Sequence, residues 1–300
     1  MTNLHDLVTR LQRLDVRLSD DDGYLGYSAP DGVVDDALLD ELRAHKDELL
    51  AFIRQGRDAA AHQQLRALPH DGVVPASPVQ RGLWFVGQQG GGNVAYNVPF
   101  VSALSGPLDA AVLARSLDEV VRRHESLRTT FELRGDTPVQ VIHPARSLDF
   151  PVDDLTDLGP EARDAELERR LELEVHRPFD LERGPLLRAR LLRLAADEHV
   201  LCLVVHHIVA DGWSLTVLCR ELGALYPAFA AGRPSPLEPL PLQYADFSRW
   251  HAERLAGDAA ERHLAHWRQS LADLPALRLP TDRPRPATPT FRGDHHIHII

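Results

Sequence analysis

The most constraining feature of this 300-residue chain is an uninterrupted apolar run that ends in two histidines. The residues from Val200 to Val205 are all apolar, which is typical of a strand buried on both faces of a sheet. His206 and His207 follow at once, and Asp211-Gly212-Trp213-Ser214 comes shortly after them. A strand that leads through a polar loop into a helix is a common position for a ligand site in α/β proteins.

The two histidines are expected to face opposite sides of the strand. Alternation places His207 on the face of Leu203 and Val205, and His206 on the other face. One imidazole can therefore face a cleft while the other packs into the structure. Histidine is the side chain best suited to proton transfer near neutral pH.

The loop after the histidines adds three residues with distinct uses. The Asp211 carboxylate is expected to orient an imidazole or to hold the loop by pairing with a cation. Gly212 lets the backbone come close to a ligand, and Ser214 is expected to cap the following helix. These residues alone predict a histidine-dependent acyl-transfer or hydrolysis site, with a structural or metal-binding histidine pair as the alternative.

The first 55 residues predict a small separate unit. Leucines recur at helical spacing from Leu4 to Leu14. Residues 16–19 and 24–28 are predicted to form a hairpin around an aspartate-rich turn at 20–23. Asp35 or Asp36 is expected to cap one longer helix that reaches Ile53. The predicted order is helix, hairpin, helix.

From Val73 onward, alternating helical and strand patterns predict a mixed α/β unit. Helices are expected at about 113–121, 161–176 and 214–231. Strands are expected at 95–101, 128–133, 139–143, 186–194 and 200–205, with a last one beginning near 294.

The composition excludes several classes of function. The chain has 33 Lys and Arg residues against 44 Asp and Glu, whereas a general nucleic-acid binder shows a basic face. No apolar run reaches the roughly 18 residues of a membrane span, and the N-terminus lacks a signal-peptide pattern. Cys202 and Cys219 form no disulfide framework. We expect a cytoplasmic protein with no metal, membrane or nucleic-acid partner.

Four segments carry a family resemblance. His206–Ser214 resembles the HHxxxDGWS signature of the condensation domains of nonribosomal peptide synthetases. Three more segments resemble motifs of that family and keep its order, namely Ser77–Trp84, Arg123–Phe131 and Tyr244–Trp250. Residues 279–286 and 291–293 also resemble the family.

The resemblance implies the fold and the reaction. The fold is a lobe similar to chloramphenicol acetyltransferase, which the family pairs with a second lobe. In the reaction, the amine of an aminoacyl group on a downstream carrier protein attacks a thioester on an upstream carrier protein. Phosphopantetheine arms of the carriers hold both groups, so no cofactor bound directly to this chain is expected.

The resemblance also implies roles for the signature residues. The catalytic set is His207, His206, Asp211 and Gly212, in which His207 assists or positions the amine and the Gly212 amide helps to bind the donor thioester. Asp211 is expected to be mainly structural, paired with Arg128 or Arg123. The supporting residues are Arg128, Arg123, Trp213 and Ser214.

The N-terminal unit resembles the TubC-type docking domains of such synthetases. In that family an exposed hairpin captures a C-terminal tail of the upstream subunit by adding it as a strand. A docking-domain homodimer is a further possible partner. The alternative is a mini-domain that only caps the fold. The implied docking residues are Val16, Leu18, Tyr24, Leu25, Tyr27 and Lys46.

The predicted fold class is α+β or α/β, a small αββα domain followed by an acetyltransferase-like α/β sandwich lobe. The predicted boundaries are 1–56 for docking, 57–72 for a linker, 73–270 for the N-terminal lobe and 271–300 for an extended connection. Because the motifs of the second lobe are absent, we expect a fragment that is inactive alone.

Several functional alternatives stay open. The chain can be the subtype of condensation domain that joins two L-configured units, which the segment 95–99 favours. An epimerisation domain shares the signature but follows a carrier domain, and a heterocyclisation domain has aspartates in place of the histidines. A recruitment protein without catalysis is the alternative from another class.

Overall fold

A computed structural model describes residues 4–21, 23–30, 32–53, 65–88, 94–277 and 280–284 of the protein. The chain divides into two compact units, residues 1–65 and residues 66–300. The predicted strand near residue 294 and residues 57–64 of the predicted linker fall outside the described residues. None of the helices in the described ranges combines the length and the apolar character that a bilayer crossing requires.

The first unit follows the predicted order of helix, hairpin and helix. Its elements are α1 (Leu4–Arg13), β1 (Arg17–Asp21), β2 (Tyr24–Ser28) and α2 (Asp36–Ala44), followed by a helical segment at 46–53. A small apolar core joins them, formed by Leu7, Leu11, Val16, Leu38, Leu42 and Leu49.

Two local predictions in this unit are wrong. Asp20 and Asp21 belong to β1 instead of the turn, because they pair with Leu25 and Tyr24 on the antiparallel strand β2. The single long helix is broken at His45, a turn residue. The Leu49 backbone N–H donates to the His45 carbonyl over 2.9 Å, so a second helical segment starts directly after His45.

A four-stranded sheet organises the second unit. The order is β4-β9-β8-β7, and only the β7–β8 pair is parallel. The strands are β7 (Val152–Asp154), β8 (Leu187–Arg193), β9 (Glu198–His206) and β4 (Asn97–Ser105). The predicted buried strand is confirmed: every residue of β9 after Glu198 is buried.

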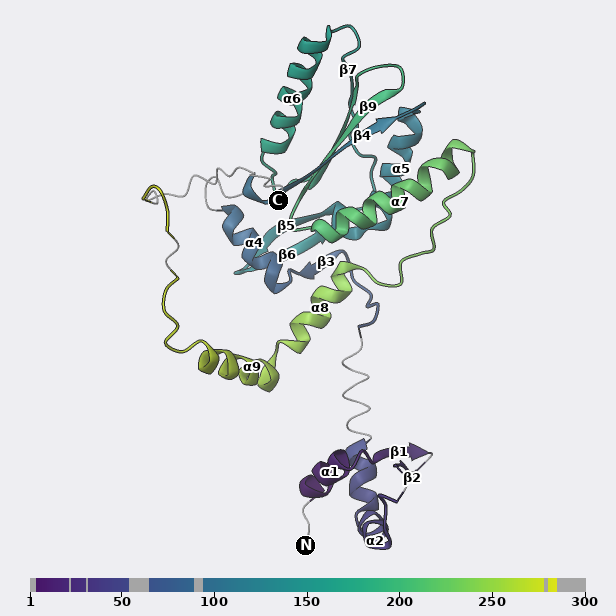
Figure 1. The fold of residues 1–300 in the computed structure, drawn as a ribbon, viewed down its shortest axis with the longest axis vertical. Coiled ribbons are helices and arrows are strands. Elements are labelled where there is room, and N and C mark those ends of the chain that lie inside the picture. The colour runs from purple at the N-terminus through teal and green to yellow at the C-terminus, as the bar shows by residue number, and fades with distance from the viewer. Residues whose placement is uncertain are drawn as a thin grey trace. The chain divides into compact units, whose positions relative to one another are not determined.

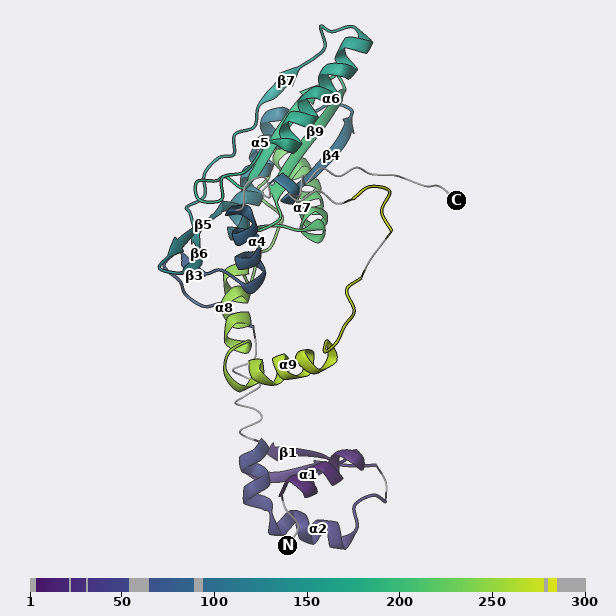
Figure 2. The same ribbon diagram turned by 90° about the vertical axis from the view of Figure 1, so that its left-hand side faces the viewer.

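Helices cover both faces of this sheet (Figures 1 and 2). Helix α6 (Pro160–His176) lies along one face, and α5 (Ala110–Arg123) and α7 (Gly212–Ala230) lie together along the other. The arrangement explains why β9 is apolar on both faces. It also explains why α7, which starts directly after the histidine loop, is held against the sheet.

A smaller three-stranded sheet has the order β3-β6-β5. Its strands are β3 (Val73–Pro75), β5 (Thr129–Arg134) and β6 (Thr137–Ile142). The predicted β5–β6 hairpin with its turn at 135–136 is confirmed. The remaining elements are α4 (Pro78–Gln88), η1 (Val94–Tyr96), η2 (Glu125–Arg128), α8 (Tyr244–Arg254) and α9 (Gly257–Ser270).

We predict that Leu203→Ala destabilises the second unit by about 3 kcal/mol, because Leu203 is fully buried in β9 and the change leaves a cavity. Urea unfolding followed by circular dichroism measures the effect. Val101→Ala on the neighbouring strand β4 is the control, since Val101 is 46% exposed. Equal losses for the two variants would contradict the central position of β9.

Candidate active site at the end of strand β9

His206 is fully buried, with 0% of its surface exposed. The Phe179 ring meets it edge-on at 5.9 Å, and the Tyr96 ring lies 6.3 Å away. The Ile208 backbone N–H donates to Nδ1 over 3.1 Å. Burial, with a smaller contribution from the neighbouring His207, lowers the pKa of His206 to about 4.

These contacts determine which ring nitrogen of His206 carries the proton. At neutral pH the ring is uncharged, and because a backbone donor occupies Nδ1, the proton sits on Nε2. Neither nitrogen is then free to take a proton from a substrate. The geometry therefore places the His206 ring inside the structure, away from solvent, while its membership of the catalytic set stays a prediction.

His207 is exposed, so the two rings differ in environment as strand alternation predicts. Its backbone N–H donates to the Tyr96 carbonyl over 2.9 Å. Its Nδ1 lies 3.0 Å from the Ala210 carbonyl oxygen. Because a carbonyl can only accept, Nδ1 is the donor and Nε2 of the neutral ring keeps its lone pair. This is the arrangement of a positioned hydrogen-bond and proton acceptor.

Asp211, and not Ser214, is the N-cap of α7. Its Oδ1 accepts from the Ser214 backbone N–H (2.8 Å) and the Ser214 hydroxyl (2.6 Å). The Ser214 hydroxyl oxygen also accepts from the Asp211 backbone N–H (3.1 Å), which completes a reciprocal capping box. The bonds from Ser214 lower the pKa of Asp211. The helix start is therefore fixed by the loop itself.

The predicted pairing of Asp211 with Arg123 or Arg128 is wrong. The buried Arg123 guanidinium lies 3.4 Å from Glu221, farther along α7. Arg128 lies 3.4 Å from Glu125 and donates to the His143 carbonyl. Arg123 joins the end of α5 to α7, while Arg128 ties η2 to the residue after β6. The Asp211 carboxylate is already satisfied by its cap, so it needs no cation.

Gln80 is a site residue that motif reasoning did not single out. It is buried on α4, and its amide nitrogen donates to the Ile208 carbonyl over 3.2 Å. Its amide oxygen accepts from the Ser77 backbone N–H over 3.0 Å. The only available signal was its place inside the segment 77–84. Gln80 ties the first motif to the histidine loop.

Trp213 is 77% exposed at the first turn of α7. Beside it, a cavity of about 220 Å³ opens between α5, α7 and the histidine loop. His124, Val209, Ala210 and Ser214 are among its lining residues. Trp213 and Ser214, both predicted as supporting residues, thus border the same cavity.

Within the described ranges, no group of three or more His, Cys, Asp or Glu side chains is placed to hold a metal ion. The histidines at 295, 296 and 298 lie outside those ranges. Cys202 is buried on β9, and burial raises the pKa of its thiol to about 11, so it is not a thiolate at neutral pH.

In the first unit the hairpin divides its side chains between core and solvent. Val16 is buried, and Leu18 and Leu25 pack against the core. Tyr24 and Tyr27 are exposed. Among the predicted docking residues, Lys46 and Tyr24 come together: the Lys46 Nζ lies 5.4 Å from the centre of the Tyr24 ring.

Comparison with known proteins decides the family. Residues 70–299 match the Condensation domain family. The chain belongs to this family. Residues 4–55 match the TubC N-terminal docking domain. The chain therefore combines a docking domain with condensation domain sequence, the organisation found in nonribosomal peptide synthetases.

Individual relatives agree with this family assignment. Over 82% of its length the chain is 59% identical to chondramide synthase cmdD of Chondromyces crocatus, of which it spans 6%. It resembles the X-domain in the complex with OxyB from teicoplanin biosynthesis at 33% identity and a TM-score of 0.68, covering 76% of this chain and 50% of that one. It resembles the EpoB cyclization-docking bidomain of Sorangium cellulosum at 26% identity and a TM-score of 0.61, covering 91% and 53%.

We predict that the condensation domain loses stability as the pH falls from about 6.5 to about 4, by up to about 3 kcal/mol from His206 alone. The folded-state pKa is depressed, so this stability is complete above the unfolded value and is lost as acid protonates the buried ring. His206→Asn keeps an acceptor for Ile208 and removes the titration. Urea unfolding at several pH values measures both proteins.

The difference between the two stability curves isolates His206, because all other titrating groups are shared. The exposed His176, replaced by Asn, is the matched control and should leave the wild-type slope unchanged. Parallel curves for wild type and His206→Asn would show that burial does not lower the pKa of His206.

Proposed function

We propose that this chain provides the docking domain and one lobe of a condensation domain that forms an amide bond between two carrier-bound substrates. The observation that supports the proposal best is the exposed His207 ring, whose Nδ1–H is held by the Ala210 carbonyl. That bond leaves the Nε2 lone pair available at the end of the family signature. A positioned imidazole of this kind suits an incoming amine.

In the proposed reaction the neutral amine of the downstream aminoacyl group attacks the carbonyl carbon of the upstream thioester. The C–N bond forms and the C–S bond breaks. The amine gives up one proton, and the thiol of the upstream phosphopantetheine arm leaves with one. His207 Nε2 accepts a hydrogen bond from the amine and orients it. Holding two tethered reactants in line already removes much of the barrier.

The start of α7 is the proposed contact for the thioester carbonyl. A Cβ atom at Gly212 would meet no atom within 4 Å, so packing among the described residues does not require glycine there. The Asp211 carboxylate satisfies the Ser214 amide, while the Gly212 amide stays at the exposed helix start. Helix N-termini favour partial negative charge, such as that on a carbonyl oxygen under attack.

We propose residues 1–56 as the docking domain, 57–72 as the linker, 73–270 as the N-terminal lobe and 271–300 as the connection. The division of the chain at residue 65 and the two family matches support this scheme. The chain spans about half of the solved structures that it matches. We therefore propose that these 300 residues need a second lobe to be active.

The partners in this proposal are carrier proteins and an upstream subunit. The carriers bring both substrates on phosphopantetheine arms. The upstream subunit is captured by its C-terminal tail, which adds as a strand to the β1–β2 hairpin. The exposed Tyr24 and Tyr27 and the Lys46 ammonium provide its side-chain contacts. A docking-domain homodimer is compatible with the same hairpin.

We predict that His207→Ala lowers the rate of amide formation by about two orders of magnitude in a two-lobed protein that contains this chain. Intact-mass detection of the peptide on the downstream carrier measures the product. His263→Ala, at an exposed histidine on α9, is the control and should retain full activity. A fully active His207→Ala would overturn the proposed role of this ring.

Two further arms of this experiment separate catalysis from recruitment. The 300-residue chain alone should give no product. A two-lobed protein that binds both carriers but never forms product would favour a recruitment function over an enzyme.

We predict that deletion of residues 1–55 weakens transfer from the upstream subunit but spares transfer from a donor supplied on a soluble thioester mimic. Tyr24→Ala should weaken transfer in the same way, since Tyr24 is 74% exposed and its loss leaves the small core intact. Arg43→Ala, which removes an exposed ion pair with Asp40, is the control. Unchanged transfer after the deletion would refute the docking assignment.

A further inference from the structure

The C-terminal end of α6 is held by donors from two strands. The last carbonyls of a helix have no partner inside the helix. The Asn97 side-chain amide on β4 donates to the Val175 carbonyl (2.6 Å) and the Arg177 carbonyl (2.9 Å). Arg188 on β8 donates to the Glu174 and Arg177 carbonyls, both over 2.8 Å. Two strands that flank β9 therefore grip the same helix end.

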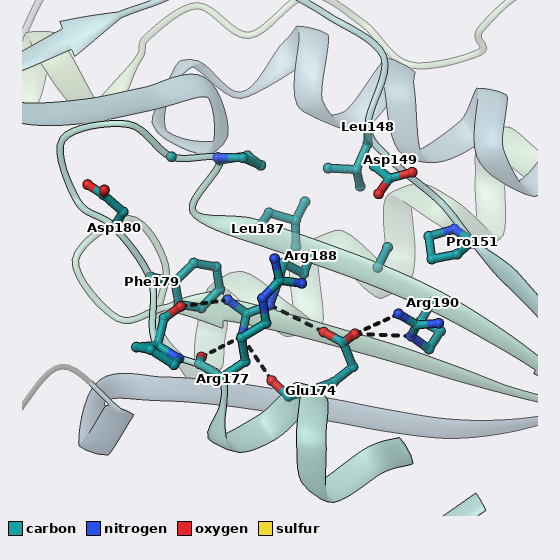
Figure 3. A pocket seen from close by; sticks show the side chains of 14 residues that line it. Leu148, Asp149, Pro151, Glu174, Arg177, Phe179, Asp180, Leu187, Arg188 and Arg190 are labelled. Carbon is teal, nitrogen blue, oxygen red and sulfur yellow. Dashed lines mark hydrogen bonds and ion pairs between the residues drawn. The ribbon is translucent and has the colours of Figure 1, made fainter. Parts of the chain in front are cut away.

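Arg188 does more than cap the helix (Figure 3). Its guanidinium carbon lies 3.7 Å from the centre of the Phe179 ring, a close cation–π contact. The side chain also lies 3.4 Å from a Glu174 carboxylate oxygen and is only 13% exposed. Burial lowers the pKa of Arg188. A cavity of about 280 Å³ borders Arg188 and Phe179.

Phe179 connects the end of α6, which Asn97 and Arg188 hold, to the histidine pair. The ring is 5% exposed and meets the buried His206 ring edge-on, with an angle of 85° between the planes. Phe179 follows α6 after only Arg177 and Pro178, so the position of its ring depends on where the helix end is held. We expect a shift of that end to shift the ring relative to His206.

The chemistry of Arg188 favours a role in positioning its neighbours over a contribution to net folding stability. A buried cation costs desolvation energy, and an apolar side chain of similar volume often replaces a buried ion pair without loss of stability. A guanidinium, however, is a rigid fork of donors. Here the fork fixes carbonyls and a ring face in one arrangement, which a flexible apolar chain does not do.

We propose that Arg188 is a positioning residue for the histidine pair. By fixing the end of α6 and stacking on Phe179, it keeps the His206 ring in the orientation that binds the Ile208 amide, and so sets the direction of His207. The effect on the reaction rests on the proposed function. The effect on His206 does not depend on it.

The test is Arg188→Met, which fills similar space without donors. Nitrogen NMR of the labelled 300-residue chain reports the tautomer and the titration midpoint of His206. We expect the midpoint to rise by at least about one pH unit, because the loosened ring becomes hydrated. In the two-lobed protein we expect kcat to fall roughly ten-fold, with the KM for the carriers unchanged.

The matched control is Arg190→Met. Arg190 lies two residues away on β8, contacts Glu174 over 2.8 Å and borders the same cavity. Its bonds go to the carboxylates of Glu174 and Asp153, and within the described ranges no stacking on Phe179 and no bond to a backbone carbonyl at the end of α6 is found for it. We expect it to leave the His206 signals and kcat unchanged, whatever it does to stability.

A second variant keeps the proposal testable if Arg188→Met does not fold. Phe179→Leu keeps the guanidinium and its carbonyl bonds, and should move the His206 midpoint in the same direction. A folded Arg188→Met or Phe179→Leu with unchanged His206 signals overturns the proposal. If Arg190→Met shifts His206 equally, general charge loss is the cause and the proposal also fails.

The NMR signals of His206 and the rate of the two-lobed protein test the role of Arg188 and the proposed function separately. Altered His206 signals with an unchanged rate would confirm the structural link and refute the part of the proposal that concerns the reaction. Unaltered signals with an active wild-type enzyme would leave the proposed function intact and refute the role of Arg188.

Discussion

Strand β9 has no solvent-facing side from His199 to His206, because α6 covers one face of the sheet and α5 with α7 covers the other. Everything at the site depends on this burial. Burial of a charged side chain inside such a strand is costly, and the His206 ring is held neutral there, with its Nδ1 bound by the Ile208 amide. The next residue, His207, is the first to leave the sheet, and its ring reaches solvent. The boundary between the buried strand and the exposed loop falls between His206 and His207. The two side chains are of the same type, but they differ in charge environment and in hydrogen bonding.

The hydrogen bonds around that boundary give the two rings opposite tautomers. His206 receives a backbone N–H at Nδ1 and so carries its proton on Nε2, while His207 gives its Nδ1 proton to a carbonyl and leaves Nε2 bare. Both partners, Ile208 and Ala210, lie in the loop that the histidines begin. The carbonyl of Ile208 is in turn held by Gln80. A few backbone groups in one loop thus set the proton positions without help from Asp211.

Much of this was predictable from the sequence. The apolar run at 200–205 predicted the buried strand, and alternation predicted one buried and one exposed imidazole. The partners of Arg123 and Asp211 were not predictable, because a charged residue contacts whatever the fold brings near it, and Glu221 on α7 is 98 positions away from Arg123. The break at His45 was missed because apolar spacing continues across it. Phe179 and Arg188 carried no motif, since stacking between distant side chains leaves no periodic signal.

The loop from His206 to Ser214 is closed on itself at both ends, by the histidine contacts at its start and by the reciprocal cap at its finish. Such a segment has no slack, and one inserted or deleted residue would separate the proton positions from the helix start. When segments of two synthetases are recombined to make new peptides, the position of the junction in this lobe therefore matters. The stretch 233–242, which has no regular secondary structure and ends before the Gln243 cap of α8, is where we expect a junction to be tolerated better. The histidine loop has to be inherited whole, together with the α4 glutamine that grips it.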